Sequence, residues 1–154
     1  RYVVGGMSMW ALQGLPMVPP TARRLAAILD GVGEREASLG MMPPLFGDLT
    51  WRAVAWNAVV AGCRPAELAV VATAAAATLE PEFNLLGLMT TTGSACVATL
   101  VHGPIVDTLA MNASINCLGP GNRANAAIGR AVSLFCEDEP VPTSVDHTER
   151  SAPP

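Results

Sequence analysis

The residues best suited to chemistry gather between Met111 and Arg130, in the segment MNASINCLGPGNRANAAIGR. Cys117 supplies a thiol, and the turn Gly119-Pro120-Gly121 follows it, with Asn122 and Arg123 next. Because glycine relaxes the backbone and proline fixes it, the chain should turn here. A helix that begins after such a turn offers unpaired N–H groups and the positive end of its dipole. We therefore expect this segment to bind a small-molecule anion or a thiol.

Three residues are candidates for catalysis. Cys117, near a helix start and Arg123, would ionise below the reference pKa of about 8.5 and act as a thiolate. His102 would serve as proton relay. Cys96, beside three threonines in an expected loop, is the second candidate thiol. The alternative for each residue is structural, because cysteine often packs as a small apolar side chain and a lone histidine usually satisfies a local hydrogen bond.

The expected substrate-binding residues surround the same turn: Asn116, Gly119, Gly121, Asn122 and Arg123. The carboxamides suit a carboxylate but equally suit turn formation, and Arg123 could equally be a solvent-facing charge. The turn matches neither GxxxxGK[ST] nor GxGxxG, so no nucleotide motif is present. No paired ligand spacing favours zinc. We expect no cofactor and no metal.

Helices are predicted from caps and apolar spacing. Asn122 should cap a helix of about 12 residues that begins at Arg123. Thr21 and Thr50 should cap two earlier helices. Further helices are expected over Pro65 to Leu79 and over Ile105 to Leu109.

Strands are predicted over Ala37 to Met42, Asn84 to Thr92 and Val97 to His102, where apolar or β-branched residues lie between turn signals. Together with the helices, these strands predict an α+β fold, a single layered domain with about four helices packed on a small sheet.

The length of 154 residues fits one domain. We expect an extended lead-in arm over 1–20, the α+β domain over 21–136 and a flexible, acidic, proline-rich tail over 137–154. No secretory signal is visible at the start of the sequence. The four cysteines have no CxxC spacing, which favours free thiols in a reducing compartment and a cytoplasmic location.

The composition favours an oligomer. It is 51% hydrophobic and only 14% charged, so another chain should cover part of the surface, as a homo-oligomer or a hetero-oligomer with a separate subunit. The net charge is −4 and the basic residues are dispersed, which argues against nucleic acid. The longest apolar run, Leu68 to Leu79, is shorter than the about 20 residues that cross a bilayer, so no membrane association is expected.

Several segments also carry a family resemblance. Asn57 to Pro65 (NAVVAGCRP), His102 to Ile105 (HGPI) and Cys117 to Ala126 (CLGPGNRANA) resemble, in that order, the C-terminal domain of the UGSC family of selenoproteins and their thiol homologues. The resemblance covers about Pro16 to Val132. It implies a thiol or selenol redox context and a shortened, stand-alone, diverged member, because family members typically carry the reactive motif in an N-terminal domain. Arg52 stands where the family usually has a glutamate.

Two hypotheses follow. In the first, the chain is an enzyme or enzyme subunit whose thiol site handles a small carboxylate or a sulfur-containing substrate, completed by a partner chain. In the second, it is a non-catalytic structural subunit of a UGSC-like complex, whose glycine turn and apolar surface dock the partner that supplies the chemistry.

Overall fold

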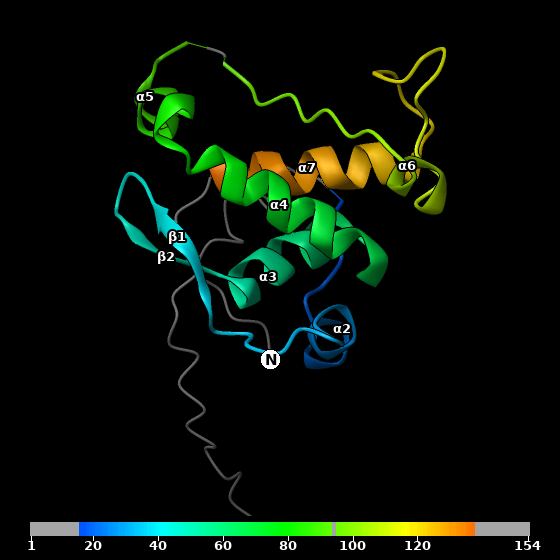
Figure 1. Ribbon diagram of the computed structural model, residues 1–154, viewed down its shortest axis with the longest axis horizontal. Helices are drawn as coiled ribbons and strands as arrows, with labels where there is room; N and C mark the ends of the chain where they lie inside the picture. Colours follow the sequence, from blue (N-terminus) through cyan, green and yellow to red (C-terminus); the bar gives the residue numbers. More distant parts are fainter. Residues whose placement is uncertain (1–15, 94, 138–154) are drawn as a thin grey trace, which may run out of the picture.

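The computed structural model describes residues 16–93 and 95–137, and side chains as far as Leu134. In these residues it contains six α-helices, two short 3-10 helices and one two-stranded antiparallel sheet, so the α+β prediction is confirmed. Figure 1 shows a layer of helices with the sheet at one side. In chain order the elements are α2 (Ala22–Ile28), β1 (Ser38–Met42), β2 (Gly47–Thr50), α3 (Trp51–Ala61), η1 (Pro65–Glu67), α4 (Leu68–Thr78), η2 (Pro81–Phe83), α5 (Leu85–Thr90), α6 (Ile105–Thr108) and α7 (Arg123–Glu137).

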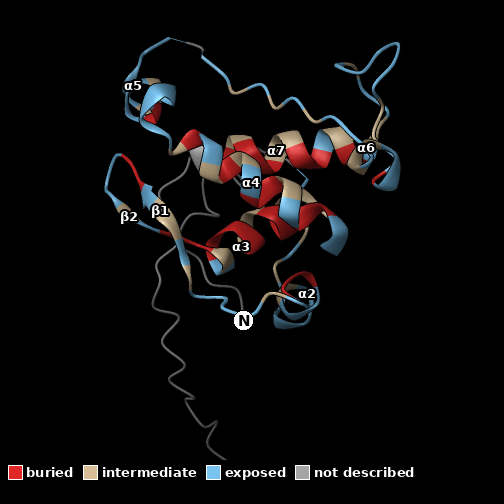
Figure 2. Ribbon diagram, viewed as in Figure 1, coloured by how far each residue is buried: buried red, intermediate tan, exposed pale blue. Residues whose placement is uncertain are grey.

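The hydrophobic core lies where α3, α4 and α7 meet, and Figure 2 shows the buried residues concentrated there. Small residues let the helices approach closely: Ala55, Ala58 and Ala75 are fully buried. Larger side chains such as Val54 and Ile128 fill the space between the helices. Burial of apolar surface contributes about 25 cal/mol per Å², so this helical layer supplies most of the stabilisation.

The predicted caps are present. Thr50 Oγ1 accepts a hydrogen bond from the Ala53 N–H at 3.2 Å, and Thr21 Oγ1 accepts one from Arg24 at 3.4 Å. Gly62, with a φ of 90°, ends α3 in the left-handed conformation that glycine adopts at low cost. The helix predicted from Pro65 begins as the 3-10 turn η1 and continues as α4 to Thr78.

The sheet is a hairpin of β1 and β2, in which Met41 pairs with Asp48 and Ser38 pairs with Thr50. The strand predicted over Ala37 to Met42 is confirmed as β1, whereas β2 was not predicted. The second strand leads directly into α3, so the hairpin and the helical layer join without a loop.

Two other predicted strands are wrong. Asn84 to Thr92 contains the helix α5, because the Asn84 side chain caps it by accepting a hydrogen bond from the Gly87 N–H at 3.3 Å. A short apolar run does not by itself distinguish a buried strand from a helix. Val97 to His102 is extended but pairs with no described strand.

Of the predicted arm over 1–20, residues 16–20 are described and extended, and the Val18 N–H donates to the Val60 carbonyl at 3.1 Å. Residues 1–15 and 138–154 lie outside the described part of the chain, and with them the rest of the predicted arm and nearly all of the predicted tail.

Candidate functional site

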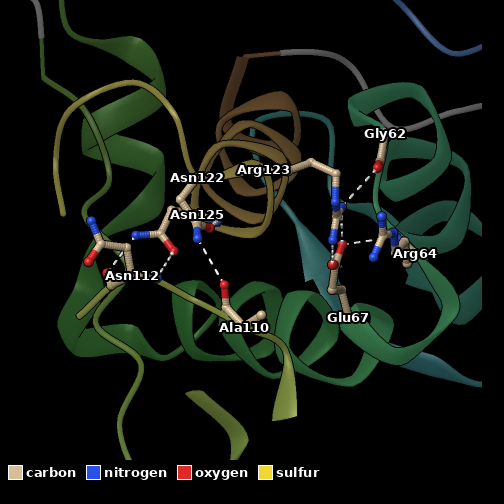
Figure 3. Close-up of polar contacts among 8 residues, drawn as sticks. All are labelled: Gly62, Arg64, Glu67, Ala110, Asn112, Asn122, Arg123 and Asn125. Carbon is tan, nitrogen blue, oxygen red and sulfur yellow. Dashed lines mark hydrogen bonds and ion pairs between the residues drawn. The ribbon is translucent and has the colours of Figure 1, made fainter. Parts of the chain in front are cut away.

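The predicted site is the loop over residues 111–121, which joins α6 to α7 and which we call the asparagine loop. Asn125, from the first turn of α7, holds it from inside. Its Nδ2 donates to the carbonyl of Asn112 at 2.9 Å and to that of Cys117 at 3.1 Å. Its Oδ1 accepts from the Asn112 N–H at 3.1 Å. Figure 3 shows Asn112 and Asn125 meeting in this way. One carboxamide therefore fixes both ends of the loop's exposed tip.

Asn122 joins the loop to the helix. Its Oδ1 accepts from the Asn125 N–H at 2.9 Å, as the predicted N-cap should, and its Nδ2 donates to the Ala110 carbonyl at 2.8 Å (Figure 3). The capping prediction for Asn122 is confirmed. Its hydrogen-bonding capacity is thus used within the chain.

Asn116 and the two glycines shape the turn itself. Asn116 has a φ of 63°, and its Nδ2 donates to the Pro120 carbonyl at 3.2 Å. A Cβ on Gly119 would lie 1.7 Å from Asn116 Oδ1, so only glycine fits beside that side chain as it stands. Gly121 has a φ of 118°, which glycine tolerates. These residues therefore have structural roles in the turn.

The asparagine loop presents apolar side chains to the outside. Leu118 is 101% exposed and Ile115 is 92% exposed, and Cys117 between them is also exposed. An ordered loop that displays large apolar side chains is more typical of a binding surface than of a catalytic pocket.

Arg123, the expected anion clamp, points to the opposite side of α7 from the asparagines (Figure 3). Its guanidinium pairs with the buried carboxylate of Glu67 through both Nη atoms, with Nη1 at 3.1 Å from Oε2. Glu67 Oε2 also accepts from the Arg64 N–H at 2.8 Å. The hydrogen bond to Glu67 raises the pKa of Arg123 further above its ordinary value. The anion that Arg123 binds is therefore part of the protein.

Cys63 lies beside this ion pair. Burial raises the pKa of its thiol to about 12; the negative charge of Glu67 acts in the same direction, and Arg123 acts against it. Because the thiolate is the reactive form, Cys63 is a poor nucleophile near neutral pH.

Cys96 and His102 are both exposed on the extended segment 95–102. Six residues separate them, which is about 20 Å in an extended chain, so they do not meet within one molecule. Among the described residues, no hydrogen bond joins Cys117, Cys96 or His102 to another of the three. Of these three, only His102 lines a groove of about 480 Å³ between α4 and the extended segment. Cys136 lies in α7, but its side chain is outside the described part.

The sequence reasoning missed Glu67 as a partner of Arg123. A usable signal was present, because Glu67 directly precedes the uncharged helix α4 and a carboxylate at the edge of a core needs a partner. Within residues 16–93 and 95–137, no group of three or more His, Cys, Asp or Glu residues lies close enough to hold a metal ion. No helix in that part is long and apolar enough to cross a membrane.

Comparison of the chain with protein-family models, curated proteins and solved structures finds no significant match.

Proposed function

We propose that the chain is a non-catalytic partner subunit, of the kind expected in a UGSC-like complex, and that it docks a thiol- or selenol-bearing protein through the asparagine loop. The observation that carries the proposal is the contrast within this loop. Its backbone is held by the side chains of Asn112, Asn116, Asn122 and Asn125, while Leu118 lies fully exposed. A pre-organised loop loses little conformational entropy on binding, and exposed apolar residues gain most from burial.

The use of Arg123 supports a docking role over a catalytic one. Its guanidinium is engaged by Glu67, and the cap of α7 is filled by Asn122. The two groups expected to bind a substrate anion thus already have partners inside the chain. What remains accessible at this end of α7 is largely an apolar surface.

The test uses a separately produced UGSC-type thiol domain and isothermal titration calorimetry. We expect the wild-type chain to bind it and Leu118→Ser to weaken binding at least about tenfold, as for an exposed apolar hot spot. Leu45→Ser is the matched control, because Leu45 is also an exposed leucine, at 63%, but lies at the hairpin turn. No binding by the wild type, or equal losses in the two variants, would exclude this proposal.

A second candidate function rests on Cys117. The thiol is exposed, and the carbonyl of the same residue is held by Asn125, so the proposed partner could meet a fixed sulfur atom. In this version the docked complex handles a small carboxylate or sulfur compound and Cys117 is the thiolate. Turnover of a small disulfide by the mixed proteins that disappears in Cys117→Ser but persists in Cys63→Ser supports it. Turnover unaffected by Cys117→Ser excludes it.

A further inference from the structure

The extended segment 95–102 has the alternation of a β-strand. Along it the side chains are turned by turns toward and away from α4, with a period of two. The half-buried residues are Val97, Thr99 and Val101, and the exposed ones are Ala98, Leu100 and His102. Leu100 is 95% exposed. In Figure 1 the segment runs from α5 to α6 with no strand beside it.

The backbone of this segment is unpaired. None of its N–H or C=O groups makes a hydrogen bond with another residue of the described part. Isolated strands are usually protected from pairing by charged residues or proline. Here the sequence from Asn84 to Val106 contains no Asp, Glu, Lys or Arg, and proline follows only at Pro104. The segment is thus a strand edge without the features that block association.

We propose that a second copy of this chain pairs with the segment, so that residues 96–102 of the two molecules form an antiparallel, two-fold symmetric ribbon. An identical strand supplies the same unpaired groups in the complementary direction. Because neither strand carries a charge, the two copies do not repel each other. The low charged fraction of the whole sequence, 14%, agrees with a covered surface.

The side chains select the register. Half-buried residues must lie opposite half-buried residues, because a slip by one position would turn them outward. Gly103, with a φ of 91°, ends the extended conformation. Pairing over the whole of 96–102 then places Thr99 opposite Thr99 of the second copy and Val97 opposite Val101. Ala98 lies opposite Leu100, which matches a small side chain with a large one, and all these pairs are favourable in antiparallel sheets.

This register has a chemical consequence. Cys96 of one copy lies opposite His102 of the other, with Cβ atoms about 5 Å apart. Two equivalent thiol–imidazole pairs therefore form on the exposed face of the ribbon. Neither pair exists in a single chain, where the two residues are about 20 Å apart. The inference does not depend on docking through the asparagine loop, which is a separate surface.

Cross-linking tests the register. In His102→Cys, mild oxidation should give a covalent dimer whose disulfide joins Cys96 of one chain to residue 102 of the other, identified by peptide mass spectrometry. The two positions are too far apart within one chain for a disulfide, which needs Cα atoms within about 7 Å. Ala98→Cys is the matched control on the same face and should give no link to Cys96. Equal linkage of Cys96 to both positions, or no linkage in either variant, overturns the register.

Sedimentation equilibrium tests the ribbon itself. Successive residues of a strand direct their N–H groups to opposite edges, and proline removes this group. Of Thr99→Pro and Leu100→Pro, one should raise the dimer dissociation constant at least about tenfold and the other by much less. Circular dichroism checks that both variants keep the helical content. A wild-type chain that is monomeric at 100 µM, or variants that change dimerisation equally, overturns the proposal; a monomer that binds other proteins through this segment also does so.

Discussion

Glu67 and Arg123 lie 56 residues apart and form an ion pair that joins the start of α4 to the start of α7. The two side chains differ in exposure: the carboxylate is 2% exposed and the guanidinium 40%. Glu67 therefore depends on Arg123 for neutralisation, whereas Arg123 could be hydrated without Glu67. The effects of substitution should be correspondingly unequal.

Arg123→Ala should lower the free energy of unfolding by about 2–3 kcal/mol, below the 3–5 of a fully buried pair because Arg123 is partly exposed. The reason is the uncompensated buried charge of Glu67. Urea denaturation measures the loss. The exposed pair of Arg52 and Glu36 provides a control, and Arg52→Ala should cost less than about 1 kcal/mol.

The charge-compensation argument also predicts the behaviour of a double variant. Glu67→Gln in the Arg123→Ala background removes the buried charge, so it should recover part of the lost stability. A double variant less stable than Arg123→Ala alone would show that the charge of Glu67 is not what makes the single substitution costly.

Cys63 should make stability fall with rising pH between about 9 and 12. Its folded-state pKa of about 12 lies above the ordinary value of 9.0, so the stabilisation is complete below 9 and is lost as the unfolded thiol ionises. The slope should approach 1.4 kcal/mol per pH unit for one proton, and Cys63→Ser should lack this slope. Parallel urea denaturation of the two proteins at several pH values gives the difference; equal slopes would contradict the assignment.

Iodoacetamide should distinguish the three described cysteines. Cys96 and Cys117 are exposed, while Cys63 is partly covered and its thiol stays protonated at neutral pH. At pH 8, native Cys63 should therefore be alkylated much more slowly than the other two. Peptide mass spectrometry resolves the sites, and denatured protein serves as control, since all three should then react at similar rates.

Gly119→Ala should disturb the asparagine loop by displacing one side chain. The new Cβ would meet Asn116 Oδ1, so Asn116 must rotate and lose its hydrogen bond to Pro120. The expected cost is about 1 kcal/mol, and hydrogen exchange should accelerate over 114–121. In an Asn116→Gly background the same substitution should have almost no effect. A cost that persists there would place the constraint in the backbone instead.

Asn125→Ala should loosen the whole loop, because one carboxamide makes three of its hydrogen bonds. We expect a loss of about 1–3 kcal/mol and faster amide exchange from Asn112 to Cys117. Asn125→Asp retains the acceptor for the Asn112 N–H but not the two donors, so it should fall between wild type and Asn125→Ala. An alanine variant with unchanged exchange would mean that the loop is held by other contacts.

Much of the helical layer could be predicted, because its signals are local. Thr21, Thr50 and Asn122 cap helices through hydrogen bonds to residues three positions later, and apolar spacing marks the faces that pack. The segment after Asn84 was misjudged for the same reason in reverse. Its apolar run suited a strand, and the cap that makes it a helix depends on one side chain.

The candidate site could be predicted in place but not in arrangement. The turn and the cap were local and were correctly located. The partner of Arg123 was not, because nothing in the spacing of residues 67 and 123 indicates that α4 and α7 start side by side. The separation of Cys96 from His102 likewise depended on whether the segment folds back into a sheet.

The unbonded stretch before the extended segment has a consequence for the integrity of the chain. Thr91, Thr92 and Gly93 are exposed and lie outside every helix and strand. On either side, α3 and α4 belong to one half of the polypeptide and α7 to the other, and the ion pair of Glu67 and Arg123 links the halves. A protease cut in this stretch would therefore yield two fragments that remain assembled, and separately expressed halves should reconstitute the fold as a split protein.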